Sequence, residues 1–268
     1  MSVETSRISA RAAFMALVDA HGNDLPLDQA VAWIDAEERG LDSIDSTIAA
    51  LDGLADGLYL PEGSTIYESI ARVNHHLFQE HGFDGDNDEY DSPDNSLISK
   101  VIERRKGLPI LLSVVYMEIA RRVGISIDGI GFPTHFVVSP SGVDPRFFID
   151  PFHQGEVMRR EQMRRWFERL AHHHQGTLRS FGAWIHPVNN RIILVRMNNN
   201  LKASCMRRGD LEGALRAVER LLILMPDALD ARRDRGLLRL ELGDEEEGAK
   251  DVDAYLAACG QVERAAQD

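Results

Sequence analysis

Apolar residues recur at helical spacing through the first 80 positions of the chain. Phe14, Leu17 and Val18 fall on one face of a helix. The same spacing returns after Pro26, which suits the first turn of a second helix. Two further amphipathic stretches cover residues 43–58 and 64–80. The pattern predicts an N-terminal region of about four helices.

The most apolar helix of the chain is predicted over residues 109–124. Pro109 suits its first turn and Gly124 suits its end. Apolar residues leave it almost no polar face, which is typical of a helix that is buried on all sides. An acidic loop over 84–94 and a predicted helix over 95–106 come before it. We therefore expect this helix to lie at the centre of the fold.

The apolar period changes after the central helix and indicates a small antiparallel sheet. Short strands are predicted over residues 130–132, 135–139 and 147–150. The last two are joined by a hairpin loop over 139–145. A loop centred between residues 142 and 143 would place His135 opposite Asp150. This middle region is therefore expected to be α+β.

The C-terminal region repeats with a period of 34 residues. The repeated pairs are Gly209 and Gly243, Val218 and Val252, and Leu222 and Leu256. This period is typical of tetratricopeptide repeats, which are pairs of helices. Two such units are too few to be stable alone, so they are expected to dock on the preceding domain or on another chain.

These patterns predict three regions in a mainly helical α+β protein. Residues 1–90 would form a helical region that covers the core, and residues 91–195 would form the core with its small sheet. Residues 196–268 would form the two repeats. The segment over 156–180 is expected to return to helix, and it carries a cluster of arginines.

The charge and the cysteine content narrow the functional classes. Thirty basic residues against 43 acidic residues give a net charge of −13, so nucleic acid is not expected as a partner. Two cysteines are too few for a disulfide framework, and no apolar run is long enough to span a bilayer. The first twenty residues lack the unbroken apolar stretch of a signal peptide. We therefore expect a cytoplasmic protein without a membrane segment.

Three segments of the chain, taken together, resemble a known family. They are NSLISKVIERRKGLPILLSVVYMEIARRVGI (95–125), GIGFPTHFVV (129–138) and FIDPFHQG (148–155). This combination resembles the bacterial transglutaminase-like family that ends in tetratricopeptide repeats, whose members are often called SirB-type regulators. The resemblance covers nearly the whole chain. Thr134 departs from it, because the family usually has glycine before the histidine.

The resemblance implies a fold similar to that of papain-type proteases, which use a Cys–His–Asp triad. The Cys lies at the N-terminus of the central helix, where the helix dipole stabilises a thiolate. His135 and Asp150 match the other two members of the triad. The Cys position lies two residues after Gly107 and fifteen before Gly124, and Pro109 occupies it. Because proline has no nucleophile, the triad is expected to be incomplete.

No other residue is a good replacement for the missing nucleophile. Cys205 and Cys259 both fall in the repeats, where they are expected to pack between helices. Ser113 lies one turn further along the same face of the central helix. It is a weaker candidate, because it lies away from the positive end of the helix dipole.

The incomplete triad leaves two interpretations open. His135 and Asp150 form either a hydrogen bond that braces the sheet or part of a polar binding cleft. For the cleft we expect Asn95, Arg104, Arg105, His135, Asp150 and His153. No cofactor is expected, and no metal site either, because the remaining histidines lack the spacing that puts two on one face.

The favoured hypothesis is a non-catalytic binding or regulatory protein that holds a protein or peptide partner through its repeats. The alternative is a hydrolase or acyltransferase that uses the pair of His135 and Asp150 without a Cys nucleophile. A third hypothesis is a scaffold in which the core only presents the repeats. An accessible His135 in a pocket would favour the enzyme, and a buried His135 would count against it.

Overall fold

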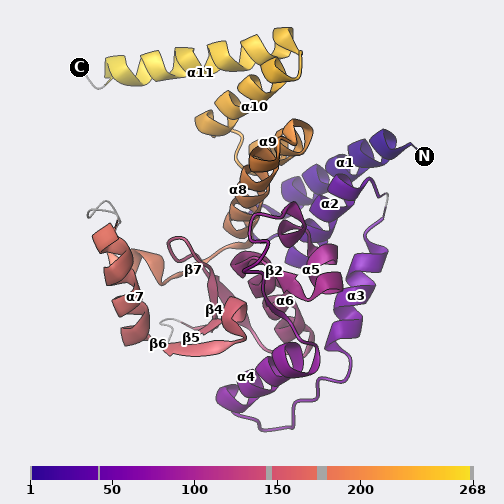
Figure 1. The fold of residues 1–268 in the computed structure, drawn as a ribbon, viewed down its shortest axis with the longest axis vertical. Helices are drawn as coiled ribbons and strands as arrows, with labels where there is room; N and C mark the ends of the chain where they lie inside the picture. Colours follow the sequence, from indigo (N-terminus) through magenta and orange to yellow (C-terminus); the bar gives the residue numbers. More distant parts are fainter. Residues whose placement is uncertain (1, 42, 143–146, 174–179, 266–268) are drawn as a thin grey trace.

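The central helix α6 (Pro109–Arg122) lies between the N-terminal helices and a small sheet in the computed structural model (Figure 1). The structure describes residues 2–41, 43–142, 147–173 and 180–265. All residues from Pro109 to Tyr116 are buried. The prediction of a buried central helix is therefore confirmed.

The N-terminal region consists of helices, as the apolar spacing predicts. They are α1 (Val3–His21), α2 (Leu27–Arg39), α3 (Asp45–Ala55), α4 (Ile66–Asn74) and the π-helical turn η1 (His75–Glu80). Thr65 and Glu68 form a reciprocal capping box at the start of α4, which satisfies two backbone N–H groups there. Helices α2, α3 and α4 all pack against α6.

The segment between the acidic loop and α6 is less helical than expected. It forms the 3₁₀ turn η2 (Pro93–Ser96) and a short helix α5 (Ile98–Arg104), because Leu97 between them is extended. Two very short strands, β1 (Asp84–Gly85) and β2 (Lys106–Gly107), pair in parallel on either side of this segment. They tie the acidic loop to the start of α6.

The main sheet is antiparallel and has the order β6-β5-β4-β3-β7. Its strands are β3 (Ile127–Ile130), β4 (Val137–Pro140), β5 (Phe147–Asp150), β6 (Glu156–Arg159) and β7 (Pro187–Val188). Alternate residues of β5 face opposite sides: Phe147 and Ile149 join the core around α6, and Phe148 joins a second core. That second core is formed with α7 (Arg160–His173), so the sheet lies between two helical layers.

The predicted hairpin register is wrong by two residues. Val138 pairs with Ile149, so Asp150 falls opposite Val137, and His135 lies before the strand begins. A turn delays the strand: the His135 N–H bonds the Phe132 carbonyl oxygen at 3.2 Å, and Thr134 has a φ of 60°. The expected centre of the hairpin falls partly on residues 143–146, which lie outside the described part of the chain.

The helix predicted over 156–180 is also shorter than expected. Its first four residues form the edge strand β6, and α7 follows. Residues 174–179 lie outside the described ranges. The chain then passes through the 3₁₀ turn η4 (Phe181–Trp184) and the edge strand β7.

The C-terminal region forms two helical hairpins, as the 34-residue period predicts. They are α8 (Asn190–Arg208) with α9 (Leu211–Leu224), and α10 (Leu229–Glu241) with α11 (Glu245–Ala265). Gly209 and Gly243 follow α8 and α10 with positive φ values of 73° and 87°. The predicted boundary at residue 196 falls inside α8. Helices α10 and α11 extend away from the sheet (Figure 1).

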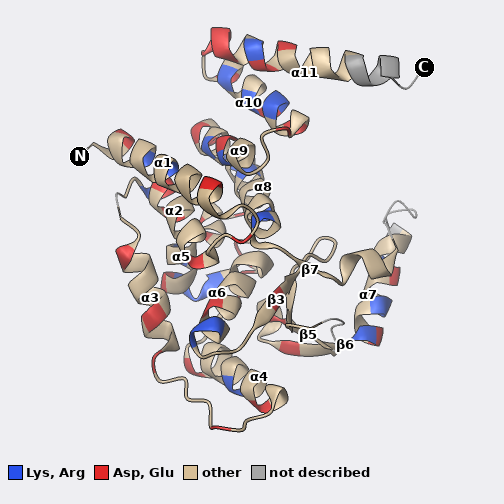
Figure 2. Ribbon diagram, turned by 180° about the vertical axis from the view of Figure 1, so that it is seen from behind, with Lys and Arg blue, Asp and Glu red and all other residues tan. Residues whose placement is uncertain are grey.

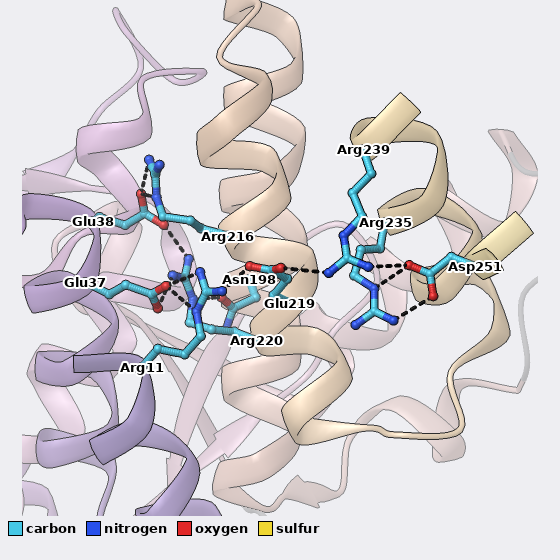
Figure 3. Close-up of polar contacts among 10 residues, drawn as sticks. All are labelled: Arg11, Glu37, Glu38, Asn198, Arg216, Glu219, Arg220, Arg235, Arg239 and Asp251. Carbon is cyan, nitrogen blue, oxygen red and sulfur yellow. Dashed lines mark hydrogen bonds and ion pairs between the residues drawn. The ribbon is translucent and has the colours of Figure 1, made fainter. Parts of the chain in front are cut away.

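The repeats dock on the N-terminal helices through buried charges (Figure 3). Arg220 of α9 is 0% exposed. It donates hydrogen bonds to Glu37 at 2.7 Å and Glu38 at 2.6 Å on α2, and to Asn198 at 2.8 Å on α8. If the repeats moved away from α2, the buried guanidinium of Arg220 would lose its carboxylate partners, which is energetically costly. These ion pairs therefore hold the repeats in one orientation on α2.

The charged contacts continue outward from this centre to the last helix (Figure 3). Arg11 of α1 contacts both Glu37 and Glu219. Arg239 of α10 lies 3.4 Å from Glu219 and 3.0 Å from Asp251 of α11. A row of ion pairs thus connects α2 to α11, and the expectation that the repeats dock on the preceding domain is met.

None of the described helices is both long and apolar enough to cross a membrane.

Candidate functional site

The predicted pair of His135 and Asp150 is formed at one end of the sheet. His135 Nε2 lies 2.8 Å from Asp150 Oδ2. His135 comes from the turn before β4, and Asp150 is the last residue of β5. The two side chains meet although the backbone register differs from the predicted one, because the turn at Thr134 directs His135 back towards the strand end.

His153 joins this pair as a third member. It ends the 3₁₀ turn η3 (Pro151–His153), and its Nδ1 lies 2.8 Å from the same Asp150 Oδ2. The other oxygen, Oδ1, accepts a hydrogen bond from the Phe152 N–H at 3.0 Å. The short turn after Asp150-Pro151 therefore brings His153 back over the carboxylate. His153 was predicted as a binding residue, and the structure places it beside the pair.

The carboxylate of Asp150 is almost completely buried, with 1% of the residue exposed. Burial acts to raise its pKa, but the hydrogen bonds and charges of His135 and His153 outweigh burial and hold the pKa below its usual value. Asp150 is therefore an anion held between two imidazoles.

The ring of His135 is enclosed by aromatic side chains. Its centroid lies 4.9 Å from the ring of Trp166 and 5.9 Å from that of Phe152. Arg196 of α8 covers the backbone on the other side, where Nη2 donates to the His135 carbonyl at 2.9 Å. His135 is only 8% exposed.

A cavity of 330 Å³ opens beside the carboxylate, between η3, β6 and α7. The polar residues that line it are Asp150, His153, Glu156, Gln162, Arg165 and Arg169. Basic residues on α7 are visible in Figure 2. Arg165 and Arg169 are exposed residues of α7 that line this cavity.

The α7 side of this cavity could be recognised in the sequence only as a cluster of arginines, without its place beside Asp150. The signal was present, because Gln162, Arg165, Trp166 and Arg169 are spaced by three and four residues and therefore share one helix face.

The position that the resemblance assigns to the nucleophile lies at the start of α6. Pro109 is the first residue of α6 and is buried. Ser113, the weaker candidate, is 0% exposed, and its Oγ has no hydrogen-bond partner. Cys205 lies in the core of the repeats, where burial, reinforced by Glu38 and Asp210, raises its pKa to about 12. A thiolate is therefore strongly disfavoured there.

Asn95 and Arg104 form a network of their own instead of joining His135. Arg104 donates to Asn95 Oδ1 at 2.9 Å and to Asp86 Oδ2 at 2.7 Å. The Asn95 amide in turn donates to the Glu89 carbonyl at 2.7 Å. Both residues thus brace the acidic loop over 84–94. Burial raises the pKa of Asp86, but the bonds from the Glu89 N–H and Arg104 outweigh it and lower the pKa overall.

Arg105, the last predicted binding residue, stacks on Phe83 with its guanidinium 4.8 Å from the ring centroid. It ends α5 in a left-handed conformation, and its Nη1 is buried without a partner. Burial lowers its pKa. The region of Asn95 and Arg104 approaches the His135 site through Phe152, which packs on Gly85 and Tyr90. The six predicted residues thus separate: His135, Asp150 and His153 come together, Asn95 and Arg104 form a second network, and Arg105 packs on Phe83.

The cluster of His135, Asp150 and His153 also has the side chains of a metal site. One ligand atom from each side chain lies within 4.8 Å of the other two. No other group of three or more His, Cys, Asp or Glu side chains comes this close in the part of the chain that the structure describes.

Several bacterial proteins are similar to this chain. A UPF0162 protein of Xylella fastidiosa is 39% identical over 190 residues, which is 70% of this chain and 66% of that protein's length. A UPF0162 protein of Vibrio cholerae is 30% identical over 195 residues, which covers 72% and 69% of the two chains. Protein SirB1 of Salmonella typhimurium is 24% identical over 193 residues, with 72% and 70% covered. No solved structure matches the chain.

Two family models match adjoining parts of the sequence. The tetratricopeptide repeat model matches residues 201–267, in agreement with the two helical hairpins. The model of the transglutaminase-like superfamily matches residues 41–199, which include α6, the sheet and the pair of His135 and Asp150. This match covers more than half of the chain; it begins between α2 and α3 and ends inside α8. The chain belongs to the transglutaminase-like superfamily.

Proposed function

We propose that this protein is a non-catalytic binding protein, in which a transglutaminase-like core without its nucleophile carries repeats that bind a protein or peptide partner. The observation that carries the proposal is Pro109 at the first position of α6. A triad enzyme forms its covalent intermediate on the side chain at this position. Proline has neither a nucleophilic group nor a backbone N–H.

The surroundings of His135 support the same function. A general base must reach the proton that it removes. Here Nε2 is engaged by Asp150 and the ring lies against Trp166. The hydrogen bonds of Asp150 instead hold the turn before β4 and the turn η3 together. The pair is therefore proposed as a brace of the sheet end.

The repeats are proposed as the partner-binding part. Leu237 of α10 is 49% exposed and Leu256 of α11 is 59% exposed. Large apolar side chains at such exposure on repeat helices are available for a partner. We keep the division into a cover (1–90), a core (91–195) and repeats (196–268) as a functional proposal, with α8 shared by the last two. The free cysteines support a cytoplasmic location.

The test uses the full chain with two surface substitutions, Leu237→Arg and Leu256→Arg. The wild-type and double-variant proteins are used to capture partners from a lysate, and each candidate is then purified and titrated against both. A purified partner that binds the wild type and loses affinity for the double variant supports the proposal. A matched control is Tyr59→Arg, which changes an exposed aromatic residue far from the repeats in sequence. Partners that bind all three proteins equally would contradict it.

The alternative, a hydrolase or acyltransferase, is favoured by one observation, the cavity beside Asp150 and His153. Its test is turnover of an activated ester and of a glutamine-containing peptide by wild-type protein and by Asp150→Asn. We expect both proteins to give the rate of the buffer. A rate above the buffer that Asp150→Asn abolishes would overturn the non-catalytic proposal.

A further inference from the structure

We propose that His135, Asp150 and His153 bind one divalent transition-metal ion, with zinc as the best-fitting ion. This inference goes beyond the binding function proposed above and does not depend on it. It rests on the geometry of the three ligand atoms, on their chemistry and on the access that the cavity provides.

The ligand atoms are already arranged around a common point. His135 Nε2 and His153 Nδ1 each lie 2.8 Å from Asp150 Oδ2, and all three atoms lie within 4.8 Å of one another. Zinc binds imidazole nitrogen and carboxylate oxygen at about 2.0–2.2 Å, which places neighbouring ligand atoms of a tetrahedral site roughly 3.3 Å apart. To hold the ion, each hydrogen bond opens by roughly half an ångström, and the two imidazole nitrogens, which now lie within 4.8 Å of each other, take the same spacing of roughly 3.3 Å.

The chemistry of the set suits a transition metal better than calcium or magnesium. Two imidazoles and one carboxylate are typical zinc ligands, whereas the alkaline-earth ions require mostly oxygen. Oδ1 of Asp150 is held by the Phe152 N–H, so Oδ2 is the oxygen that is directed at the two imidazoles. The aromatic side chains of Trp166 and Phe152 fix the His135 ring. These contacts hold the His135 ring and the Asp150 carboxylate in place before the ion arrives.

The cavity gives the ion a route and an open coordination position. The side chain of His153 is 55% exposed, and both Asp150 and His153 line the 330 Å³ cavity. Glu156 on the cavity wall favours a cation, and Arg165 and Arg169 oppose it. We therefore expect the position that faces the cavity to hold water or an anion, which the two arginines would stabilise.

The experiment uses the full chain without a histidine tag, stripped with a chelator and dialysed. Zinc chloride alone is titrated by calorimetry, and cobalt chloride is titrated with visible absorption as the readout of tetrahedral coordination. We expect one ion per chain and a cobalt spectrum that zinc displaces. His153→Ala, at an exposed position, removes a ligand and is expected to weaken binding by more than the roughly 10- to 100-fold that loss of a partner of a ligand causes. His75→Ala is the matched control, because His75 is an exposed histidine outside the site.

Binding of neither ion below millimolar concentration would overturn the proposal. Binding that His153→Ala leaves unchanged, or that His75→Ala removes, would also overturn it. All readouts are made on purified protein without a partner, so their failure is distinct from failure of the proposed binding function.

Discussion

Arg220 of α9 and Glu37 of α2 form an ion pair of 2.7 Å in which both side chains are fully buried, although 183 positions separate them in the chain. The pair joins the repeats to the N-terminal helices, while the transglutaminase-like core lies between the two in the sequence. The docking of the first repeat is therefore part of the folded core of this protein.

Arg220→Met is expected to destabilise the protein by about 3–5 kcal/mol, because it removes the fully buried partner of Glu37 and Glu38 and leaves them only the more exposed Arg11 and Arg216. Urea unfolding of the full chain measures the change. The control is Arg233→Met, which removes a more exposed arginine of α10 whose ion pairs lie at the surface. The control should lose much less stability than Arg220→Met, because ion pairs at the surface contribute little. Equal losses in the two variants would show that the buried network does not hold the repeats.

The same network predicts a loss of stability in acid. Burial acts to raise the pKa of Glu38, but Arg220 and Arg216 outweigh it and hold the folded-state pKa below the usual value of 4.5. Glu38 therefore contributes stability above its unfolded-state pKa, and this contribution is lost as the pH falls through the folded-state pKa. The free energy of unfolding, measured by urea from pH 6 to pH 3, should fall less steeply in Glu38→Gln. If the free energy of unfolding of Glu38→Gln fell as steeply with pH as that of the wild type, this assignment would be contradicted.

Thr134→Gly is expected to stabilise the protein by about 0.5–1 kcal/mol. Thr134 is a β-branched residue at a φ of 60°, where glycine is free of strain. The strain that glycine relieves in the folded state exceeds the conformational entropy that it adds to the unfolded chain. The resemblance noted in the sequence points to the same position, where relatives usually have glycine. Thermal unfolding of Thr134→Gly and Thr134→Ala checks it, and only the glycine variant should gain stability. A loss in Thr134→Gly would mean that the threonine side chain stabilises the turn.

Alkylation should distinguish the two cysteines. Cys205 is buried, with its pKa raised to about 12 chiefly by burial, whereas Cys259 is partly exposed. Iodoacetamide applied to the native protein near pH 8 should therefore add one group, at Cys259, as read by intact mass and peptide mapping. Unfolded protein in urea provides the control and should add two. Rapid labelling of Cys205 in the native state would show that the repeats open.

The elements that local sequence determines are the ones that could be predicted. Pro109 and Gly124 bound the central helix, and residues 147–150 match β5 because their apolar pattern is uninterrupted. The hairpin register was missed because it depends on the left-handed turn at Thr134. Threonine rarely adopts this conformation, so its presence in the sequence does not predict such a turn. The edge strand β6 was missed because its residues are mostly exposed and lack apolar alternation.

The candidate site could be predicted only in part, for the same reason. His135 and Asp150 follow from the resemblance, and His153 from its position just after Asp150. The partner of Arg104 could not be foreseen, because the choice between Asp86 and the His135 site depends on how the acidic loop folds back. The α7 wall of the cavity required the tertiary packing of α7 on the sheet.

Helix α8 has its first turns in one hydrophobic core and its last turns in another. Ile193 and Met197 pack in the core around α6, and Leu201 and Cys205 pack in the core of the repeats. Arg196, in the part of α8 that packs around α6, holds the turn that carries His135. The two regions therefore cannot be exchanged as separate modules in evolution or in design. A repeat array transplanted from another protein would also have to supply the helix that completes the wall behind the histidine.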